Sequence, residues 1–233
     1  MVLSIIIPVF NEENLIEEIL KRVDNVQVLN WEKEIIVVDD GSTDDSKSKI
    51  QNLKSKVQNL RIISHKKNLG KGAAIRTALN YVTGDYVLIQ DADLEYSPND
   101  FQKLLSPIQK GEAQIVYGSR NLEPAKRGYF LNFWGGKFLT FLTNLLFKTS
   151  LTDINTGYKV FKTEILKNLK LESSRFEFCE EVTARALKAG YKIVEVPISY
   201  NPRGVREGKK LRPIDGLVGF WAIVRLKFFN LGL

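Results

Sequence analysis

The sequence predicts an α/β fold of the Rossmann-like kind, in which helices flank a mostly parallel central sheet. Short β-branched runs alternate with helical patterns along residues 1–117. The runs Ile5–Ile7 and Ile35–Val38 are continuously apolar, as strands buried on both faces are. Polar residues follow several of these runs, and open parallel sheets bind their ligands beyond those strand ends.

The individual elements follow from the spacing of their apolar residues. In the first helix, apolar side chains recur at helical spacing from Leu15 to Val23, and Asn11 is a candidate N-cap. Thr43 or Asp44 is the candidate N-cap of the second helix. The predicted strands cover residues 3–9, 34–39, 61–64, 86–90 and 114–117. The predicted helices cover residues 12–26, 44–53, 72–82 and 98–109.

The alternation changes after Ser119, where aromatic and less regular sequence continues to about Leu151. A strand at 158–161, a helix at about 180–189 and a strand at 192–196 are predicted beyond it. We find no internal repeat and no linker. The chain is therefore predicted to form one domain over residues 1–212, followed by an apolar and basic C-terminal segment over 213–233.

The composition indicates a globular chain and excludes several chemistries. The 233 residues are 44% apolar and 26% charged, which are ordinary values for a folded domain. One cysteine, Cys179, and one histidine, His65, cannot form a disulfide framework or a Cys/His zinc cluster. We therefore expect a cytoplasmic protein, with Cys179 as a buried side chain and His65 in a surface loop.

The net charge of +7 lies entirely in residues 183–233, so a local anionic partner is expected. The N-terminal run lacks a basic region and is interrupted at Pro8, which favours a buried strand over a signal peptide. The stretches 129–147 and 216–233 approach membrane length, but the first contains Lys137 and the second Arg225 and Lys227. Each such charge costs roughly 2.5–3.5 kcal/mol at a bilayer centre. Both stretches are predicted to be amphipathic helices in the membrane interface.

Acidic or polar clusters follow three of the predicted strands. They are Pro8–Glu12, Asp39–Ser42 and Asp91–Asp93. Asp91 and Asp93 lie two residues apart at a strand end, and two carboxylates suit Mg²⁺ or Mn²⁺, which also bind substrate phosphates. Such an ion stabilises negative charge on a nucleotide leaving group. The alternative is that these aspartates only start turns or cap helices, and three converging clusters make it less favourable.

Four segments together resemble the nucleotide-sugar half of glycosyltransferase family 2, whose fold is the GT-A type. They are residues 8–12, 38–44, 68–72 and 90–95. Later segments resemble the subgroup that charges polyprenyl phosphates, namely dolichyl-phosphate mannose synthases and polyprenyl-phosphate glucosyltransferases. They are residues 117–120, 153–161, 195–200 and 203–210. The resemblance covers about residues 3–216 and implies a GT-A catalytic domain.

The resemblance implies a donor site with residues in defined roles. The residues implied to line the base and ribose pocket are Pro8, Phe10, Glu12 and Asp40. The residues implied to hold ribose, metal and diphosphate are Asp91, Ala92 and Asp93, with Glu95 as a further metal ligand. Lys71 lies at a helix start after Asn68–Gly70, and a helix N-terminus can bind a phosphate, so it is assigned to substrate binding. A P-loop is excluded because the Walker spacing is absent.

The candidate catalytic residues are Asp93, on the donor side, and three basic residues. Arg120 is expected near the sugar or the acceptor phosphate, while Arg203 and Lys209 lie on a loop that closes over both phosphates. A phosphate acceptor is already ionised and attacks without a general base. Glu181 falls where hydroxyl-using relatives carry a catalytic acid residue, so it is a candidate for orienting the phosphate. Acids on a helix N-terminus are the equally favoured structural reading.

The predicted function is therefore that of a metal-dependent, inverting hexosyltransferase using GDP-mannose or UDP-glucose and a polyprenyl phosphate at the cytoplasmic membrane surface. The first alternative is transfer to a hydroxyl of a polysaccharide or glycolipid, which needs a base at Glu181. A nucleotidyltransferase is a second alternative, but the glycine-rich, arginine-containing loop it needs is absent. A basic module binding membrane or nucleic acid explains only the C-terminal charge, and we expect no nucleic-acid partner. The sequence does not indicate an oligomeric state.

Overall fold

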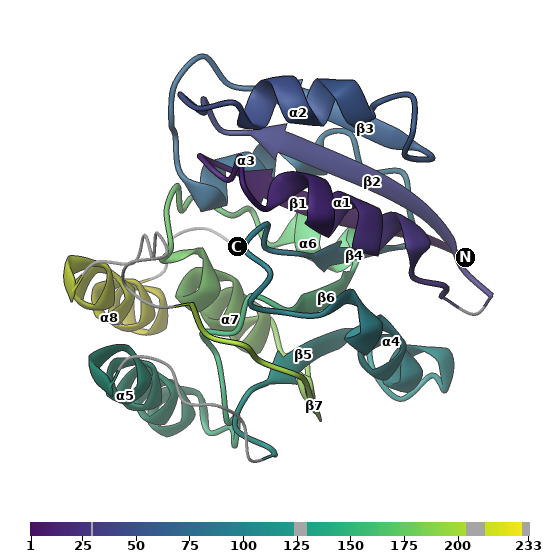
Figure 1. The fold of residues 1–233 in the computed structure, drawn as a ribbon. Helices are drawn as coiled ribbons and strands as arrows, with labels where there is room; N and C mark the ends of the chain where they lie inside the picture. Colours follow the sequence, from purple (N-terminus) through teal and green to yellow (C-terminus); the bar gives the residue numbers. More distant parts are fainter. Residues whose placement is uncertain (29, 124–129, 204–212, 230–233) are drawn as a thin grey trace.

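A computed structural model describes residues 1–28, 30–123, 130–203 and 213–229, and it contains a seven-stranded sheet of order β3-β2-β1-β4-β6-β5-β7 (Figure 1). Strand β6 runs antiparallel to both of its neighbours, while the other strand pairs are parallel. The prediction of a mostly parallel sheet is confirmed. The strands are β1 (Val2–Val9), β2 (Glu32–Asp39), β3 (Leu60–Ser64), β4 (Tyr86–Ile89), β5 (Ile115–Ser119), β6 (Lys159–Lys162) and β7 (Val194–Pro197).

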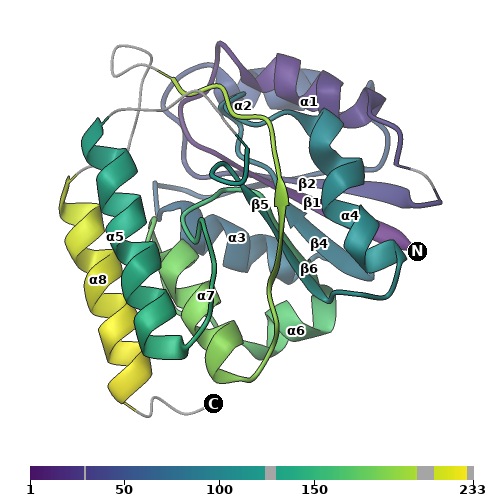
Figure 2. The same cartoon turned by 90° about the horizontal axis from the view of Figure 1, so that it is seen from below.

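Helices cover both faces of this sheet, as Figure 2 shows in a view along its edge. Helices α1, α2 and α4 cover one face, and α3, α6 and α7 cover the other. The helices are α1 (Ile16–Asn25), α2 (Ser46–Leu53), α3 (Lys71–Leu79), α4 (Phe101–Gln109), α5 (Phe130–Phe147), α6 (Thr163–Asn168), α7 (Phe178–Lys188) and α8 (Pro213–Phe228), with a 3₁₀ turn η1 (Pro98–Asp100) before α4.

The pleat of the strands divides the apolar side chains between two cores. In β1, Ile5 and Ile7 pack with α1 and α2 on one face, while Ile6 packs with α3 on the other. All three side chains are fully buried. The run in β1 is therefore continuously apolar because the strand is buried on both faces, as predicted.

Helices α5 and α8 form an outer layer beside α7, where they lie side by side (Figures 1 and 2). A third apolar cluster, which includes Leu139 of α5, Ile154 and Ile223 of α8, joins this layer to the rest of the fold. None of the helices in the described ranges is long and apolar enough to cross a membrane. The proposed boundary between residues 212 and 213 stays a prediction.

The first two helices begin later than predicted, and hydrogen bonds explain the difference. The N–H groups of Asn11, Glu12 and Glu13 donate to Ser42, Ser46 and Asp44 rather than starting a helix. Asn11 has a positive φ of 50° and does not cap α1, so that prediction is wrong. Asp44 accepts the N–H of Ser46 at 3.0 Å, so it satisfies a donor at the start of α2 from just outside the helix.

Candidate active site

The loops that follow β1 and β2 are joined to each other by hydrogen bonds. The Asn11 carboxamide oxygen accepts the N–H of Thr43 at 2.8 Å, and the Glu12 N–H donates to Ser46 Oγ at 2.8 Å. The Asp39 carboxylate accepts the N–H of Ser42 at 3.0 Å, which closes the turn after β2. The first two clusters that the sequence placed at strand ends therefore form one surface of the site.

Asp40 is buried beside the loop that precedes α3, and both of its carboxylate oxygens have partners. They accept the N–H groups of Leu69 at 2.9 Å and Gly70 at 2.7 Å, and one also meets His65 Nδ1 at 2.7 Å. His65 Nε2 lies 2.9 Å from Thr77 Oγ1 of α3. The expectation of His65 as a surface residue is wrong, because its side chain is only 10% exposed and links the β3 loop to α3.

Asp91 and Asp93 lie at the end of β4, as predicted, and each faces a different cation. Lys71 Nζ, at the start of α3, lies 2.5 Å from Asp91 Oδ1. Burial lowers the pKa of Lys71, but the neighbouring Asp91 carboxylate outweighs it and the net pKa is raised. Burial, reinforced by the charges of Asp91 and Glu95, raises the pKa of Asp93 to about 7. The environment of Asp93 therefore disfavours its ionised form.

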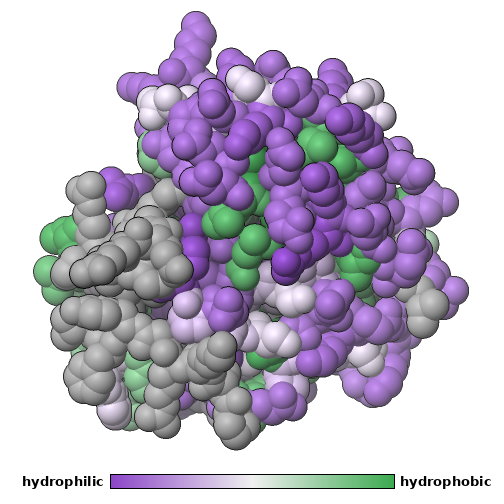
Figure 3. Space-filling view, in the orientation of Figure 1, coloured by the Kyte–Doolittle hydropathy of each residue, from purple (hydrophilic) through white to green (hydrophobic). Residues whose placement is uncertain are grey.

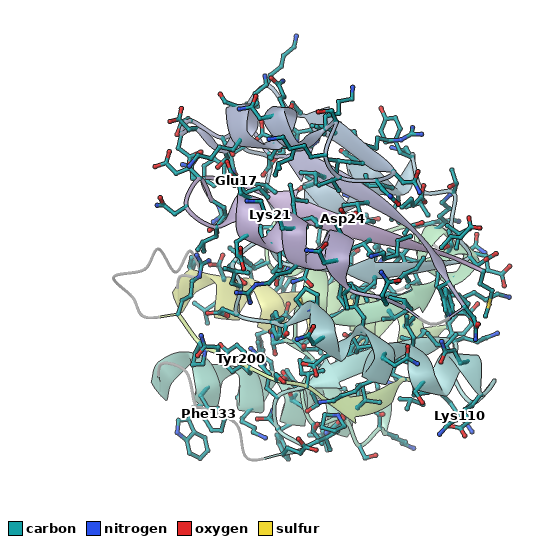
Figure 4. The ribbon with its side chains drawn as sticks, turned by 45° about the vertical axis from the view of Figure 1, so that its right-hand side comes forward. Glu17, Lys21, Asp24, Lys110, Phe133 and Tyr200 are labelled. Atoms are coloured by element: carbon teal, nitrogen blue, oxygen red, sulfur yellow. The ribbon has the colours of Figure 1, made fainter. Side chains whose placement is uncertain are left out.

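Arg203 brings positive charge to this acidic edge from the segment after β7. Its guanidinium chelates Glu12 at 3.0 and 3.1 Å and lies 3.3 Å from Asp93 Oδ2. Glu95 holds the same segment, since its carboxylate accepts hydrogen bonds from the backbone N–H of Arg203 at 2.9 Å and from the Tyr200 hydroxyl at 3.2 Å. Figure 4 shows Tyr200 on this segment, below helix α1 with Glu17 and Lys21 and above helix α5 with Phe133.

Arg120 follows β5 and is fixed by a buried carboxylate. Its Nε and Nη2 donate to the two oxygens of Asp153 at 2.6 and 2.7 Å. Burial alone raises the pKa of Asp153, but the Arg120 guanidinium outweighs it and the net pKa is lowered. The guanidinium carbon lies 5.1 Å from the centre of the Tyr200 ring, within cation–π range. Arg120 and Arg203 are therefore linked through the segment that carries Tyr200.

Glu181 is a buried structural carboxylate in α7. It accepts the N–H groups of Glu172 and Ser173 at 3.0 and 2.8 Å, and Arg185 Nε at 2.7 Å. Burial raises the pKa of Glu181, but these hydrogen bonds outweigh it and lower the pKa overall. Its neighbour Glu180 is also buried, and burial raises the pKa of Glu180 to about 7. Both acids lie in the first turn of α7, as the structural reading of this segment predicted.

The remaining predicted site residues divide into those that the structure places and those outside the described ranges. Pro8 and Phe10 are half-buried at the end of β1, beside the Glu12 cluster. Ala92 is 4% exposed and packs into the core between the two aspartates. Lys209 lies outside the described residues. The roles of all these residues in binding a donor stay predictions.

A divalent cation fits the donor set at the end of β4 if phosphate oxygens complete its coordination. Within the described ranges, no group of three or more His, Cys, Asp or Glu side chains is arranged to hold a metal ion alone. Mg²⁺ is commonly held by one or two carboxylates together with substrate phosphates and water. Asp91 and Asp93 provide the two carboxylates. Burial and the neighbouring acids raise the pKa of Asp93 and so disfavour its ionised form, and a bound cation would favour that form.

Sequence reasoning missed several contacts that shape the site. His65 is the partner of Asp40, Asp153 is the partner of Arg120, and the backbone of Gly157 lies against Asp91. For Asp153 and Gly157 the signal was present, since both belong to the segment 153–161 already noted for its resemblance. For His65 the only signal was its place after β3, at the same edge of the sheet as the acidic clusters.

Comparisons with known proteins agree with this geometry. The family model described as "Glycosyl transferase family 2" matches residues 4–170. The chain is 32% identical to a UDP-N-acetylglucosamine–dolichyl-phosphate N-acetylglucosaminyltransferase from Methanococcus voltae, over 98% of this chain and 96% of that protein. It is 31% identical to a dolichol-phosphate mannosyltransferase from Pyrococcus furiosus over 90% of this chain, and the match spans only 59% of that longer protein.

Solved structures show the same fold at lower sequence identity. Glucosyl-3-phosphoglycerate synthase from Mycobacterium tuberculosis, crystallised with Mn²⁺, UDP and glucosyl-3-phosphoglycerate, superposes with a TM-score of 0.72 at 20% identity. The superposition covers 97% of this chain and 80% of that one. A complex of the same enzyme with Mg²⁺ and UDP gives a TM-score of 0.74. The GT-A-like sheet, the family model and the relatives together show that this chain is a glycosyltransferase that belongs to glycosyl transferase family 2.

Proposed function

We propose that this glycosyltransferase moves a hexose from a nucleoside-diphosphate sugar to a polyprenyl phosphate. The observation that carries the proposal is that Arg203 contacts the acidic edge formed by Glu12, Asp93 and Glu95. An acidic edge suits a cation that bridges a diphosphate, and an arginine beside it suits a second anion. The relatives whose names include a dolichyl or dolichol phosphate support that second anion as the acceptor.

The residues of the site divide the work of bringing two anions together. Asp91 and Asp93 would hold Mg²⁺ or Mn²⁺, which supplies Lewis-acid stabilisation of the departing nucleoside diphosphate. Arg120 and Arg203 carry guanidinium groups of the kind that bind phosphate oxygens, and in this structure carboxylates of Asp153 and Glu12 hold them. Pro8 and Phe10 provide apolar surface beside Glu12 for the base and ribose. Lys71 holds the Asp91 carboxylate in place through their 2.5 Å contact.

The acceptor oxygen of a phosphate monoester needs no general base, and Glu181 favours this route. Its carboxylate is already held by two backbone N–H groups and by Arg185, so it does not face a reacting hydroxyl. A phosphate oxygen therefore attacks the anomeric carbon directly, the bond to the diphosphate breaks, and the configuration inverts. This supports a phosphate acceptor over the hydroxyl acceptor that was the alternative.

The donor is GDP-mannose or UDP-glucose in this proposal. A mannosyltransferase and glucosyltransferases occur among the relatives at similar identity, 31% for the Pyrococcus enzyme and 31% for a Trichomonas vaginalis dolichyl-phosphate β-glucosyltransferase. The structural neighbours that were crystallised with UDP support the use of a nucleotide donor by this fold. The donor assay below separates the two sugars.

A lipid acceptor requires contact with a membrane surface, and the outer layer of α5 and α8 offers one. Exposed aromatic and aliphatic side chains gather on these helices, and Figure 3 shows hydrophobic atoms at the left edge of the molecule, where α8 lies. They are Trp134, Phe138, Phe141 and Leu145 on α5, and Ile214, Leu217, Trp221 and Phe228 on α8. The cations Lys137 and Lys227 lie beside them and suit anionic headgroups. We therefore place the protein peripherally on the cytoplasmic face of a membrane.

One assay tests the proposal as a whole. Purified protein is incubated with undecaprenyl or dolichyl phosphate and a panel of labelled nucleotide sugars, with Mg²⁺ or with EDTA. The expected result is a labelled glycolipid from GDP-mannose or UDP-glucose, with no product in EDTA. Label that enters a soluble sugar or a polysaccharide without lipid would overturn the proposed acceptor.

Two variants connect this assay to the site. Asp93→Ala removes a carboxylate that would hold the ion, and Arg203→Ala removes the guanidinium beside it, so each should lower turnover by about 100-fold or more. Glu18→Ala is the matched control, since its ion pair with Arg22 lies on the exposed surface of α1. Full activity in either site variant would contradict the assigned roles.

A further inference from the structure

The segment that connects α5 to β6 is held from several sides. We refer to residues 153–158 of this segment as the connector. The N–H groups of Thr152 and Asp153 donate to the Glu195 carboxylate at 2.7 and 2.9 Å. Ile154 and Tyr158 are fully buried, so side-chain packing fixes the same stretch. The connector is therefore a well-determined part of the fold rather than an adaptable loop.

The first residue of the connector fixes Arg120. Asp153 is 3% exposed, and its two oxygens accept both the Nε and Nη2 of that guanidinium as well as the Arg120 backbone N–H at 3.1 Å. A bidentate pair of this kind defines the plane and the direction of the guanidinium group. The fork of Arg120 is therefore aimed by Asp153.

The fifth residue of the connector lies against Asp91. A Cβ atom placed on Gly157 would come within 2.2 Å of Asp91 Oδ2 and 3.1 Å of Asp91 Cγ. It would also come within 2.9 Å of Cε2 in Tyr96, whose hydroxyl accepts the Gly157 N–H at 3.1 Å. Only glycine leaves room for the Asp91 carboxylate where it stands, with Lys71 on its other oxygen, Oδ1.

The direction of β6 explains why one segment reaches both residues. Strand β6 lies between β4 and β5 and runs antiparallel to both. Its first residues therefore lie at the edge of the sheet where β4 and β5 end, and Asp91 and Arg120 follow those two strands. A parallel strand in this place would bring its opposite end to the site.

We propose that the connector is the positioning element of the active site, in which Asp153 aims Arg120 and the bare Cα of Gly157 seats Asp91. The proposal rests on the proposed function, because it gives the two residues their roles toward the acceptor and the donor. Asp153 and Gly157 are positioning residues, since each acts through the side chain that it holds. One rigid segment thereby sets the spacing between the group that meets the acceptor and the group that meets the donor.

The first test uses Gly157→Ala, with Gly135→Ala as the matched control. A Cβ on Gly135 meets no atom within 4 Å, so its alanine variant should behave as the parent chain does. Mn²⁺ binding is measured by electron paramagnetic resonance in the presence of UDP or GDP. Gly157→Ala should weaken nucleotide-dependent Mn²⁺ binding by about 10- to 100-fold, as the loss of outer-shell support for a metal ligand does. Unchanged binding would overturn the role of Gly157.

A second readout needs neither metal nor activity. In the Asp91→Ala background the carboxylate that a new methyl group would meet is gone, so Gly157→Ala should lower the melting temperature much less there than in the parent chain. Two variants that destabilise independently would instead give additive shifts. Additivity would show that residues 91 and 157 are not coupled and would contradict the proposal.

The third test separates the acceptor side. Asp153→Asn removes one charged acceptor of the bidentate pair, so KM for the polyprenyl phosphate should rise by about tenfold or more while KM for the nucleotide sugar changes little. In an Arg120→Ala background the same substitution should have no further effect on acceptor KM. An equal loss in both backgrounds would mean that Asp153 does not act through Arg120.

The outcomes also separate this inference from the proposed function. If the parent chain binds Mn²⁺ with neither UDP nor GDP and makes no glycolipid, the proposed function fails. The coupling between residues 91 and 157 is then still decided by the melting temperatures. If the parent chain binds and transfers but the connector variants do the same, only the inference fails.

Discussion

At the scale of single residues, three acids of the active site each face a cation from another part of the chain. Lys71 from the start of α3 balances Asp91, and Arg203 from the segment after β7 is shared by Glu12 and Asp93. Such pairs hold the carboxylates in place, but burial and the neighbouring acids still raise the pKa of Asp93. A diphosphate with its cation would therefore enter a site whose charges are already arranged around it.

Glu181 illustrates how a residue resembling a catalytic acid can have a structural task. Glu181→Gln keeps the shape of the side chain but weakens its partly buried hydrogen bond to Ser173 and its buried ion pair with Arg185. We expect the free energy of unfolding to fall by about 1–3 kcal/mol, while the specific activity of the folded protein stays unchanged. Denaturant unfolding and steady-state kinetics measure the two effects.

Glu18→Gln serves as the control for this variant. Glu18 forms an ion pair with Arg22 on α1, and its side chain is 52% exposed, so its loss should change the stability little. A large loss of kcat in Glu181→Gln at unchanged stability would restore the general-base reading and with it a hydroxyl acceptor.

Glu180 predicts a pH dependence of stability. Burial raises the pKa of Glu180 to about 7, above its value in the unfolded chain, so the folded state binds the extra proton. Stability from this group is present in full below the unfolded pKa of about 4.3 and is lost as the pH rises through 7. Glu180→Gln should therefore be more stable than the parent at pH 8, by about 1–3 kcal/mol, and similar to it at pH 5.

Denaturant unfolding at pH 5 and pH 8 measures this difference. Glu18, whose side chain is 52% exposed on α1, is the control, because Glu18→Gln should show no such change between the two pH values. The nearby charges that act on Glu180 are Lys159 and Glu177, and the Asn155 carboxamide donates a hydrogen bond to it. A parent chain that gains stability relative to Glu180→Gln on going from pH 5 to pH 8 would reverse the sign and contradict the assignment.

At the scale of elements, α8 combines a buried side with an exposed apolar side. Ile223 and Leu226 are buried against the rest of the fold, while Leu217 and Trp221 are 67% and 56% exposed. Deleting this helix would therefore expose the third apolar cluster and destabilise the fold. A loss of membrane binding could then result from unfolding. Substitutions of the exposed residues are the sharper test of the membrane surface.

The double variant Leu217→Ser/Trp221→Ser should bind vesicles less strongly. Each lost side chain removes about 1.5–3 kcal/mol of apolar burial if it inserts fully, so binding should weaken by at least about tenfold. Co-sedimentation with vesicles of phosphatidylglycerol and phosphatidylcholine measures this, and Mn²⁺–nucleotide binding should stay unchanged. Tyr81→Ser, an exposed aromatic after α3, is the control. Equal sedimentation of the double variant and the parent would contradict a lipid-facing role for α8.

The elements also show where sequence patterns succeed and where they stop. The first five strands were predicted within two residues, because polar residues end their apolar runs. The runs of β1, β2, β4 and β5 are buried on both faces, while β3 at the edge of the sheet is partly buried. Helix α6 was not predicted, since its six residues are too few to show a helical period. The antiparallel direction of β6 was not predicted either, because period-2 patterns are the same in both directions.

At the scale of the whole molecule, the parts of the site that were predicted are those that local sequence patterns can report. The clusters after β1, β2 and β4 were found because parallel strands end at one edge of the sheet. The pairs Asp40–His65 and Arg120–Asp153 join segments 25 and 33 residues apart, and no periodicity reports such distances. Local patterns therefore located the site, while the partners that orient its residues required the three-dimensional fold.

A site assembled from distant segments predicts that its ligand stabilises the whole chain. The acidic edge draws on β1, β4 and the segment that carries Arg203, so a ligand bound there holds parts that unfolding separates. At 100 times its dissociation constant, Mn²⁺ with UDP or GDP should add about 2.7 kcal/mol and raise the melting temperature by roughly 5–10 °C. Scanning fluorimetry measures the shift, and EDTA or Asp93→Asn should abolish it. An equal shift in EDTA would mean that the nucleotide binds without the ion and that Asp91 and Asp93 have another task.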